Sequence, residues 1–471
     1  MRKTKIIATI GPASRDPEIL DQLIEAGMDC ARLNFSHGTL EEHAEVIRSV
    51  RELSAKHHRP VTIFQDLGGI KLRLGYREEP VELTHGEEVY IVPDARSGRP
   101  DVLPFPQPSI IRNLRPGNLV FISDGVVCLE VLETDGQQVK TRVRNGGTLS
   151  SYKGVNLPGV SIDQPVLTDD DKVALQFGVE QDVDWVGISF VRSLEDMRYA
   201  KAFLNNIGSG ARVMAKLERS EGIENIDSIL LEVDGVMVAR GDLGVEIAME
   251  RVPIVQKQIV KKSEEGAKVS CIATQMLRSM VYSPTPTRAE LSDIANAVLD
   301  GCDSILLSDE IAVGEYPVEA VRMADITIRE AEKIYPYYKA LSSWDRTQAI
   351  AAAAANLTRT LNSKPIVITS TGRAAFELSR FRPENDIIVF SHDESVLRQL
   401  ALAWGVVPVG VIPPEPDIAK LVSMLIKESL NTGLVSETDV VTIVHGFMTG
   451  VSGTTNTVQV LQVKDYLARS A

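Results

Sequence analysis

Eight short apolar runs, most of them followed by an amphipathic helical stretch, constrain the fold of this chain more than any other feature of its sequence. Each run is rich in Val, Ile, Met, Ala and Cys and has the length of a strand that is buried on both faces. The runs span residues 5–10, 30–36, 61–67, 185–190, 212–218, 235–243, 269–276 and 304–310. Strand–helix repetition of this kind predicts a closed (β/α)8 TIM barrel, with an open doubly wound sheet as the alternative.

The segment between the third and fourth runs has a different character. Residues 70–165 contain hairpin-like apolar runs that are separated by the turn signals PGN, SDG, TDG and NGG. The pattern predicts a small all-β domain that is inserted into the loop after the third strand, at the carboxyl end of the barrel. A domain in that place is suited to act as a lid that excludes water from a site, although a passive insertion is the alternative.

A third region follows the last barrel strand. From residue 341 to residue 471, helical and strand-like runs alternate again, which predicts a separate open α/β domain. The predicted organisation is therefore a barrel formed by residues 1–69 and 166–340, a lid domain at 70–165, and a C-terminal effector or oligomerisation domain at 341–471.

The composition limits which cellular compartment and which binding partners are expected. The chain has 471 residues, 44% of them hydrophobic and 24% charged, and a net charge of −14. It shows no apolar run of the roughly 18–20 residues that cross a bilayer, and its N-terminus lacks the apolar core of a signal peptide. The acidic balance argues against nucleic-acid binding. Isolated cysteines in apolar segments indicate buried thiols in a reducing compartment, so we expect a cytoplasmic protein without membrane contact.

Two neighbouring strands end in residues that suit a metal–phosphate site. Lys216 and Glu218 lie two positions apart on one strand and therefore share a face, and Asp242 follows the next strand. Two carboxylates beside a lysine suit Mg²⁺ (or Mn²⁺) together with a phosphate. Glycines flank Asp242 in GDLGVE, where free amide groups before a helix would bind an anion. A structural ion pair at the barrel rim and a tight turn are the alternatives.

The second strand ends in another polar set. Alternation places Arg32, Asn34 and Ser36 on one face, where Arg32 offers two donors to a phosphate and the other two offer oxygens to a cation. His37 follows them, and a lone histidine here is more often a loop residue than a catalyst. Four basic residues are expected to ring the mouth despite the acidic total, namely Arg32, Arg73, Lys153 and Lys216. The chain has no phosphate loop of the G-x-x-x-x-G-K-[ST] type.

Long ordered motifs along nearly the whole chain resemble those of the pyruvate kinase family in its bacterial form. They are TKIIATIGPAS, GMDCARLNFSHG, YKGVNLPG, AKLE, VARGDLGVE, ATQML followed by PTPTRAELSDIANAVLDG, RQLALAWGVVPV and GTTN. The resemblance implies transfer of a phosphoryl group from phosphoenolpyruvate to ADP, which yields pyruvate and ATP in glycolysis. It also implies a homotetramer.

The same resemblance implies roles for the residues of the mouth. Glu218 and Asp242 would bind the divalent metal, and Lys216 would stabilise the phosphoryl group in transfer. The substrate phosphate would bind Arg32, and the substrate carboxylate would bind the Gly241 amide and Thr274, with Thr274 near the carbon that is protonated. The residues implied to face ADP are Asn34, His37, Arg73 and Lys153.

One departure from the family pattern concerns the monovalent cation. Many family members have a glutamate where this chain has Lys71, and they need K⁺ at a site that corresponds to Asn34, Ser36, Asp66 and Leu67. We expect the Lys71 ammonium to replace that ion, so that K⁺ is not required. A solvated residue at the lid hinge is the alternative.

Two further departures lie elsewhere. The family's common SGETA is SDEIA here, with Asp309 and Ile311 in place of glycine and threonine, and the sequence does not show whether Asp309 faces the mouth. In the C-terminal domain the loop Thr369, Ser370, Thr371 and Arg373 resembles one that holds the phosphate of a sugar-phosphate effector. Ala374 replaces a hydroxyl found in some members, and a plain helix start is the alternative.

Two other function classes remain open at this level. A metal-dependent aldolase or lyase on a similar barrel would share the lysine and carboxylates of the mouth, but the inserted β domain disfavours it. A non-catalytic or weakly active homologue that only senses an effector, such as a sugar phosphate or a nucleotide, would keep the C-terminal loop.

Overall fold

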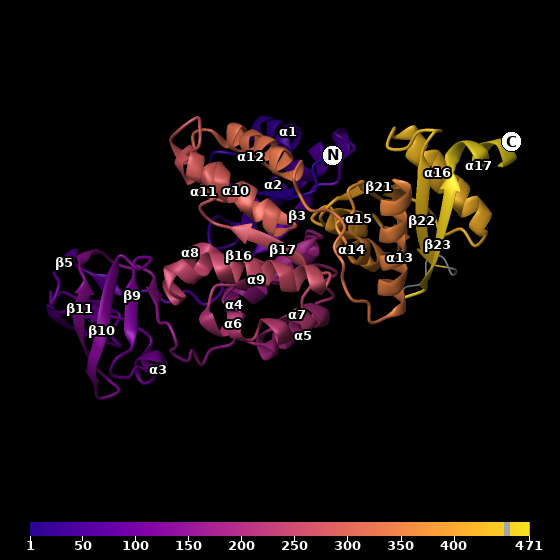
Figure 1. Cartoon of the computed structure of the whole chain (residues 1–471). Helices are drawn as coiled ribbons and strands as arrows, with labels where there is room; N and C mark the ends of the chain where they lie inside the picture. The colour runs from indigo at the N-terminus through magenta and orange to yellow at the C-terminus, as the bar shows by residue number, and fades with distance from the viewer. Residues whose placement is uncertain (447–452, 471) are drawn as a thin grey trace.

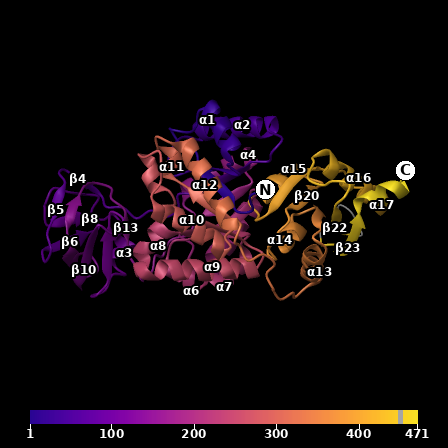
Figure 2. The same ribbon diagram turned by 45° about the horizontal axis from the view of Figure 1, so that its top comes forward.

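The computed structural model describes residues 1–446 and 453–470 of the chain. Figure 1 shows three parts in a row, with the inserted β domain and the C-terminal α/β domain on opposite sides of a central barrel, and the turned view in Figure 2 keeps this order. In the described part of the chain, no helix is long and apolar enough to cross a membrane.

Eight parallel strands close the central barrel in the spatial order β1, β18, β17, β16, β15, β14, β3, β2. This confirms the predicted (β/α)8 TIM barrel and excludes an open sheet for this part of the chain. The strands are β1 (Lys5–Thr9), β2 (Cys30–Asn34), β3 (Thr62–Asp66), β14 (Trp185–Ile188), β15 (Arg212–Leu217), β16 (Gly235–Ala239), β17 (Val269–Ala273) and β18 (Ser304–Leu307).

Several helices around the barrel begin at side chains that cap their first turn. Thr39, Thr168 and Thr287 each accept a hydrogen bond from the third helical residue, whose carboxylate in turn accepts one from the threonine amide. Leu, Ile and Val side chains of the helices fill the layer between helices and strands. The main helices are α1 (Pro17–Ala26), α2 (Leu40–Lys56), α4 (Asp169–Glu180), α5 (Leu194–Asn206), α6 (Ser220–Glu224), α7 (Ile226–Glu232), α8 (Arg240–Glu246), α9 (Val252–Glu265), α10 (Arg288–Asp300), α11 (Asp309–Ala312) and α12 (Pro317–Glu332).

The prediction that Asp242 precedes the helix was wrong. Helix α8 already starts at Arg240, directly after strand β16, so Asp242 lies in its first turn rather than in a preceding loop. The backbone leaves the helix at Ile247 and passes through a short 3₁₀ segment before α9 begins. Pro253 lies in the first turn of α9, because proline has no amide hydrogen to continue a preceding helix.

The inserted domain is built mainly from antiparallel strands. Six of them form a sheet in the order β13, β9, β10, β11, β6, β8, and two smaller two-stranded sheets flank it. A four-residue helix, α3 (Pro108–Ile111), is an addition to the predicted all-β pattern. The strands are β4 (Tyr76–Arg77), β5 (Val81–Leu83), β6 (Glu88–Val92), β7 (Arg96–Ser97), β8 (Val102–Pro104), β9 (Leu119–Ile122), β10 (Val127–Thr134), β11 (Val139–Asn145), β12 (Gly147–Leu149) and β13 (Val155–Asn156).

The C-terminal domain is an open five-stranded sheet with helices on its faces, as the sequence predicted. Its order is β21, β20, β19, β22, β23, and only the edge strand β23 runs antiparallel to its neighbour. The elements are α13 (Arg346–Leu361), β19 (Lys364–Thr369), α14 (Arg373–Ser379), β20 (Ile387–Ser391), α15 (Glu394–Leu400), β21 (Val406–Val411), α16 (Ile418–Asn431), β22 (Val440–Gly446), β23 (Thr455–Gln462) and α17 (Val463–Ser470).

The C-terminal domain closes the amino-terminal end of the barrel. Phe64, Trp185 and Met214 in the barrel interior belong to one apolar cluster with Phe376 and Leu397 of helices α14 and α15. The Trp185 indole Nε1–H donates to the Gln399 carbonyl across this contact at 3.0 Å. All four cysteines of the chain are buried and unpaired, as predicted.

Candidate functional site

A cavity of about 530 Å³ lies at the carboxyl end of the barrel, between the strand ends and the inserted domain. Strands from distant parts of the chain and the lid contribute its charged and polar side chains. They include Arg32, Asn34, Ser36, Lys71, Arg73, Asp124, Lys153, Lys216, Glu218, Asp242, Thr274 and Ser308. The four basic residues expected around the mouth, Arg32, Arg73, Lys153 and Lys216, thus line one space.

The Lys216 ammonium occupies the centre of the floor of this cavity. It lies 3.1 Å from Asp66 Oδ1 and 3.0 Å from Glu218 Oε1, and it donates to Ser189 Oγ at 2.7 Å. Burial lowers the pKa of Lys216, but the carboxylates of Asp66 and Glu218 outweigh this effect and raise the pKa above its usual value. Lys216 therefore keeps its positive charge inside the protein.

Arg32 forms the second cationic group of the floor. Its guanidinium contacts Asp66 Oδ2 at 2.6 Å and donates to Thr9 Oγ1 at 2.9 Å. Burial raises the pKa of Asp66, yet the charges of Lys216 and Arg32 outweigh burial and hold that pKa below its ordinary value. One ionised aspartate thus orients both cations toward the cavity.

Glu218 and Asp242 form an acidic pair beside Lys216. Glu218 Oε2 accepts a hydrogen bond from the Phe190 amide at 2.8 Å, which fixes its carboxylate on the cavity wall. Burial and the negative charge of Glu218 raise the pKa of Asp242 to about 6. Two neighbouring carboxylates repel each other when both are ionised, and a hard divalent cation between them would remove this repulsion. The residues present therefore fit Mg²⁺.

Gly241 and Thr274 lie next to this acidic pair. The Gly241 amide, in the first turn of α8, donates to Thr274 Oγ1 at 2.9 Å. Thr274 and Gln275 both have positive φ angles, of 72° and 58°, which are unfavourable for these residues. Arg240 holds this turn by donating to the Thr274 carbonyl at 2.7 Å. Backbone held in such a conformation often accompanies a functional site.

Lys71 and Arg73 enter the cavity from the loop that leads into the lid. The Lys71 ammonium donates to Ser36 Oγ at 2.8 Å, and Arg73 donates to the Tyr152 carbonyl at 3.0 Å. Burial and the charges of Lys216 and Arg73 lower the pKa of Lys71. Lys71 therefore contacts one of the oxygens that the sequence analysis assigned to a monovalent cation.

Two groups of predicted residues lie outside the cavity. The His37 side chain is exposed, and its backbone carbonyl accepts a hydrogen bond from His43. The loop at residues 369–373 lies in the C-terminal domain, where Thr369 Oγ1 accepts from the Gly372 amide at 3.0 Å. In the same loop, Arg373 forms an ion pair with Asp345.

The structure also places the two unusual residues of SDEIA. Asp309 begins helix α11 and forms an ion pair with Arg278, with both side chains 54% exposed. Ile311 is fully buried in the barrel core. The extra negative charge is thus paired with Arg278, in a second hollow that Gly241, Asp242 and Thr274 also line. The neighbouring Ser308 faces the mouth.

Several residues in or next to the cavity were not predicted from the sequence. Ser189 and Phe190 contact Lys216 and Glu218, and Asp124 reaches the mouth from the lid. The position of Ser189 directly after the fourth barrel strand was the available signal, since strand ends converge at the mouth. Nothing in the pattern of the inserted domain distinguished Asp124 from an ordinary turn residue.

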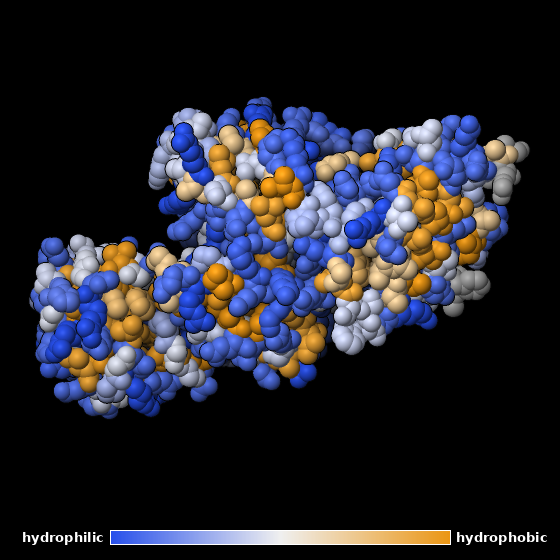
Figure 3. Space-filling view, in the orientation of Figure 1, coloured by the Kyte–Doolittle hydropathy of each residue, from blue (hydrophilic) through white to orange (hydrophobic). Residues whose placement is uncertain are grey.

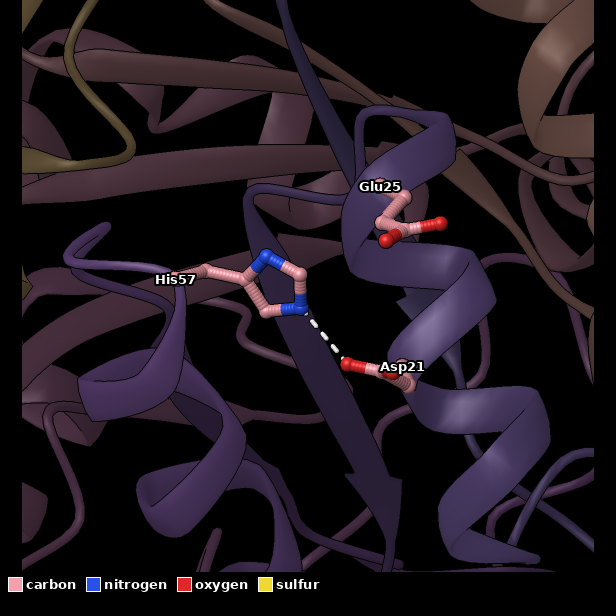
Figure 4. A group of neighbouring side chains, drawn as sticks. All are labelled: Asp21, Glu25 and His57. Atoms are coloured by element: carbon pink, nitrogen blue, oxygen red, sulfur yellow. Dashed lines mark hydrogen bonds and ion pairs between the residues drawn. The ribbon is translucent and has the colours of Figure 1, made fainter.

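A second group of potential metal ligands lies on the outside of the barrel. Asp21, Glu25 and His57 offer ligand atoms within 4.8 Å of one another, from helix α1 and the end of α2 (Figure 4). Asp21 already contacts His57 at 2.6 Å and Lys56 at 2.7 Å. We interpret this group as a surface ion-pair cluster, separate from the mouth.

The barrel and its mouth define a class, the metal-dependent phosphotransferases of the (β/α)8 type. Comparison with known proteins narrows this class. Residues 1–321 match the model of the pyruvate kinase barrel domain, and residues 348–461 match that of the pyruvate kinase alpha/beta domain. The chain belongs to the pyruvate kinase family, whose members are phosphotransferases that need Mg²⁺.

Bacterial relatives extend this similarity over the full chain. A pyruvate kinase of Sporosarcina psychrophila is 40% identical over 480 aligned residues, which cover 100% of this chain and 82% of the relative. A pyruvate kinase of Clostridium acetobutylicum is 40% identical over 474 aligned residues, which cover 98% of this chain and 100% of the relative. The relatives therefore span all three parts of the fold.

The strained turn at Thr274 leads to a first prediction. Asparagine tolerates a positive φ better than a β-branched residue does, so Thr274→Asn should raise the free energy of unfolding by about 1 kcal/mol. Thr39→Asn, at an N-cap with a φ of −108°, is the matched control and should change stability little. Urea denaturation of both variants measures the difference. A Thr274→Asn variant less stable than the parent would show that the side-chain contacts of Thr274 outweigh the strain.

Proposed function

We propose that the protein transfers the phosphoryl group of phosphoenolpyruvate to ADP and releases pyruvate and ATP, in the cytoplasm. The observation that carries this proposal is the Lys216 ammonium between two carboxylates, with Arg32 and Asp242 in the same cavity. A divalent cation held by Glu218 and Asp242 would neutralise negative charge on the transferring group.

We assign the remaining steps to the side chains around the cavity. Arg32 binds the substrate phosphate, and Lys216 stabilises the charge that develops as the phosphorus–oxygen bond to the enol breaks and a bond to an ADP oxygen forms. The Gly241 amide and Thr274 bind the substrate carboxylate. The resulting enolate then takes a proton at carbon near Thr274, which makes the transfer effectively one-way.

We place ADP on the lid side of the cavity. Arg73 and Lys153 line the cavity from the inserted domain, Asn34 lines it from the end of β2, and His37 is exposed outside it. The inserted domain, residues 70–165, acts as a lid that closes over both substrates and excludes water. Its basic residues then neutralise the nucleotide phosphates.

Replacement of Lys216 tests the proposed reaction. Lys216→Met should lower kcat by roughly 100- to 1,000-fold, because it removes the positive charge at the transferring group, and should leave the KM for phosphoenolpyruvate within a few-fold. A coupled assay of ATP formation measures both constants. Lys268→Met is the control, because Lys268 donates to the Val233 carbonyl away from the mouth. Normal turnover by Lys216→Met would refute the role of this lysine.

We also propose that activity does not require K⁺. The contact of the Lys71 ammonium with Ser36 Oγ supports this, since it puts a fixed positive charge beside an oxygen of the cation site expected at Asn34, Ser36, Asp66 and Leu67. The parent should turn over equally fast with K⁺ or with tetramethylammonium, and Lys71→Glu should make turnover depend on K⁺. Lys71→Arg retains the charge and should stay independent. Collapse of parental activity without K⁺ would exclude the proposal.

An effector site in the C-terminal domain is a further proposal. The loop of Thr369, Ser370, Thr371 and Arg373 offers hydroxyl and guanidinium donors to the phosphate of a sugar phosphate or nucleotide, which would displace Asp345 from Arg373. Such an effector should raise the melting temperature of the parent but not that of Arg373→Ala. Lys427→Ala is the control, because Lys427 is an exposed residue of α16. The absence of any change in melting temperature and kinetics across a panel of phosphorylated sugars and nucleotides would remove the idea.

The assembly that we propose is a homotetramer. Apolar side chains gather on the C-terminal domain over β22 and β23, as Figure 3 shows. Strand β23 is the edge of its sheet, and its Val460 is 37% exposed. A second copy would cover this apolar edge, and sedimentation equilibrium measures the assembly directly.

A further inference from the structure

The turn that follows strand β14 contacts both reactive side chains of strand β15. Ser189 Oγ accepts a hydrogen bond from the Lys216 ammonium at 2.7 Å, and the next residue, Phe190, donates its amide to Glu218 Oε2 at 2.8 Å. Phe190 has a φ of 56°, so its backbone lies in the left-handed region. The turn thus holds the lysine with a side chain and the glutamate with the backbone.

Ser189 is itself fixed by the start of the loop that leads into the lid. Its hydroxyl donates to the Leu67 carbonyl at 2.7 Å, and the side chain is only 2% exposed. Since the hydroxyl has one hydrogen, this bond leaves only lone pairs to face Lys216. Gly69 packs so closely on the turn that a Cβ at this position would lie 2.7 Å from Ser189 Cβ. The loop and the turn therefore form one rigid unit.

The Lys216 ammonium has three close partners, two as ion pairs and one as a hydrogen-bond acceptor, and these differ in character. Two are the carboxylates of Asp66 and Glu218, and the third is the neutral hydroxyl of Ser189. Under the proposed function, Glu218 also binds a cation, and Asp66 is shared with Arg32. Ser189 is neutral, so its contact with Lys216 does not depend on what else binds the carboxylates of Asp66 and Glu218.

We propose that Ser189 is a positioning residue for the reaction, which aims the Lys216 ammonium at the transferring phosphoryl group. This inference rests on the proposed function. Misplacement of a catalytic group by about 1 Å costs on the order of 100-fold in rate. The Ser189 hydroxyl, held by the Leu67 carbonyl, prevents such a displacement of Lys216. Ser189 is not among the residues that line the cavity, so it acts through Lys216.

Substitution of Ser189 with a matched control tests the proposal. Ser189→Ala should lower kcat by roughly 10- to 100-fold and change the KM values for phosphoenolpyruvate and ADP less than threefold. Ser270→Ala is the control, because Ser270 is equally buried and hydrogen-bonded, but to Asp303 at the opposite end of the barrel. It should lower the melting temperature without a comparable loss of kcat.

Two further variants separate positioning from packing. Ser189→Cys restores volume but offers a poor acceptor to the ammonium, so it should recover the melting temperature and not kcat. In the Lys216→Met background, Ser189→Ala should cause no additional loss of kcat, because it acts through the missing lysine. Full kcat in Ser189→Ala, recovery of kcat in Ser189→Cys, or an additive loss of kcat in the double variant would each overturn the proposal.

These outcomes are distinct from a failure of the proposed function. If the parent forms no ATP from phosphoenolpyruvate and ADP, the function itself is wrong. If the parent is active and Ser189→Ala matches it, only the role of Ser189 is refuted.

Discussion

The arrangement of the mouth depends on one buried ion-pair network, in which Lys216 lies between Asp66 and Glu218. A charged lysine inside a protein costs several kcal/mol unless opposite charges accompany it, and here the two carboxylates keep the ammonium protonated. Asp66 also pairs with Arg32, so a single aspartate links the residues of three strands. The barrel supplies the geometry, because the carboxyl ends of its strands bring these residues together from distant sequence positions.

Much of the fold followed from the sequence because strand and helix periods are local signals. The barrel, the inserted β domain and the C-terminal sheet were all predictable from apolar runs and turn residues. The start of α8 was not, because GDLG carries two glycines that favour a turn, and the helix there is set by tertiary packing rather than by propensity. Local pattern therefore located this strand end but not the structure that follows it.

The positions of site residues on strands were predictable from the sequence. The positions of site residues on loops were much less so. Alternation alone placed Lys216 beside Glu218, and Arg32 and Asn34 on one face, whereas Ser36 lies in the turn after β2. The exposed position of His37 and the pairing of Asp309 with Arg278 depend on loop paths that no local pattern specifies. Ser189 was overlooked because its role comes from what it contacts, the Leu67 carbonyl and Lys216, rather than from its chemical type.

The apolar cluster shared by the barrel interior and helices α14 and α15 bears on how such a chain can evolve. The floor of the barrel, including Trp185 and Phe64, is completed by side chains of another domain rather than by its own loops. A shortened gene that encodes the barrel alone would expose this apolar surface to water, which favours aggregation in the cell. Substitutions on the outer surfaces of the C-terminal domain are thus less constrained than substitutions on α14 and α15, which pack against the barrel.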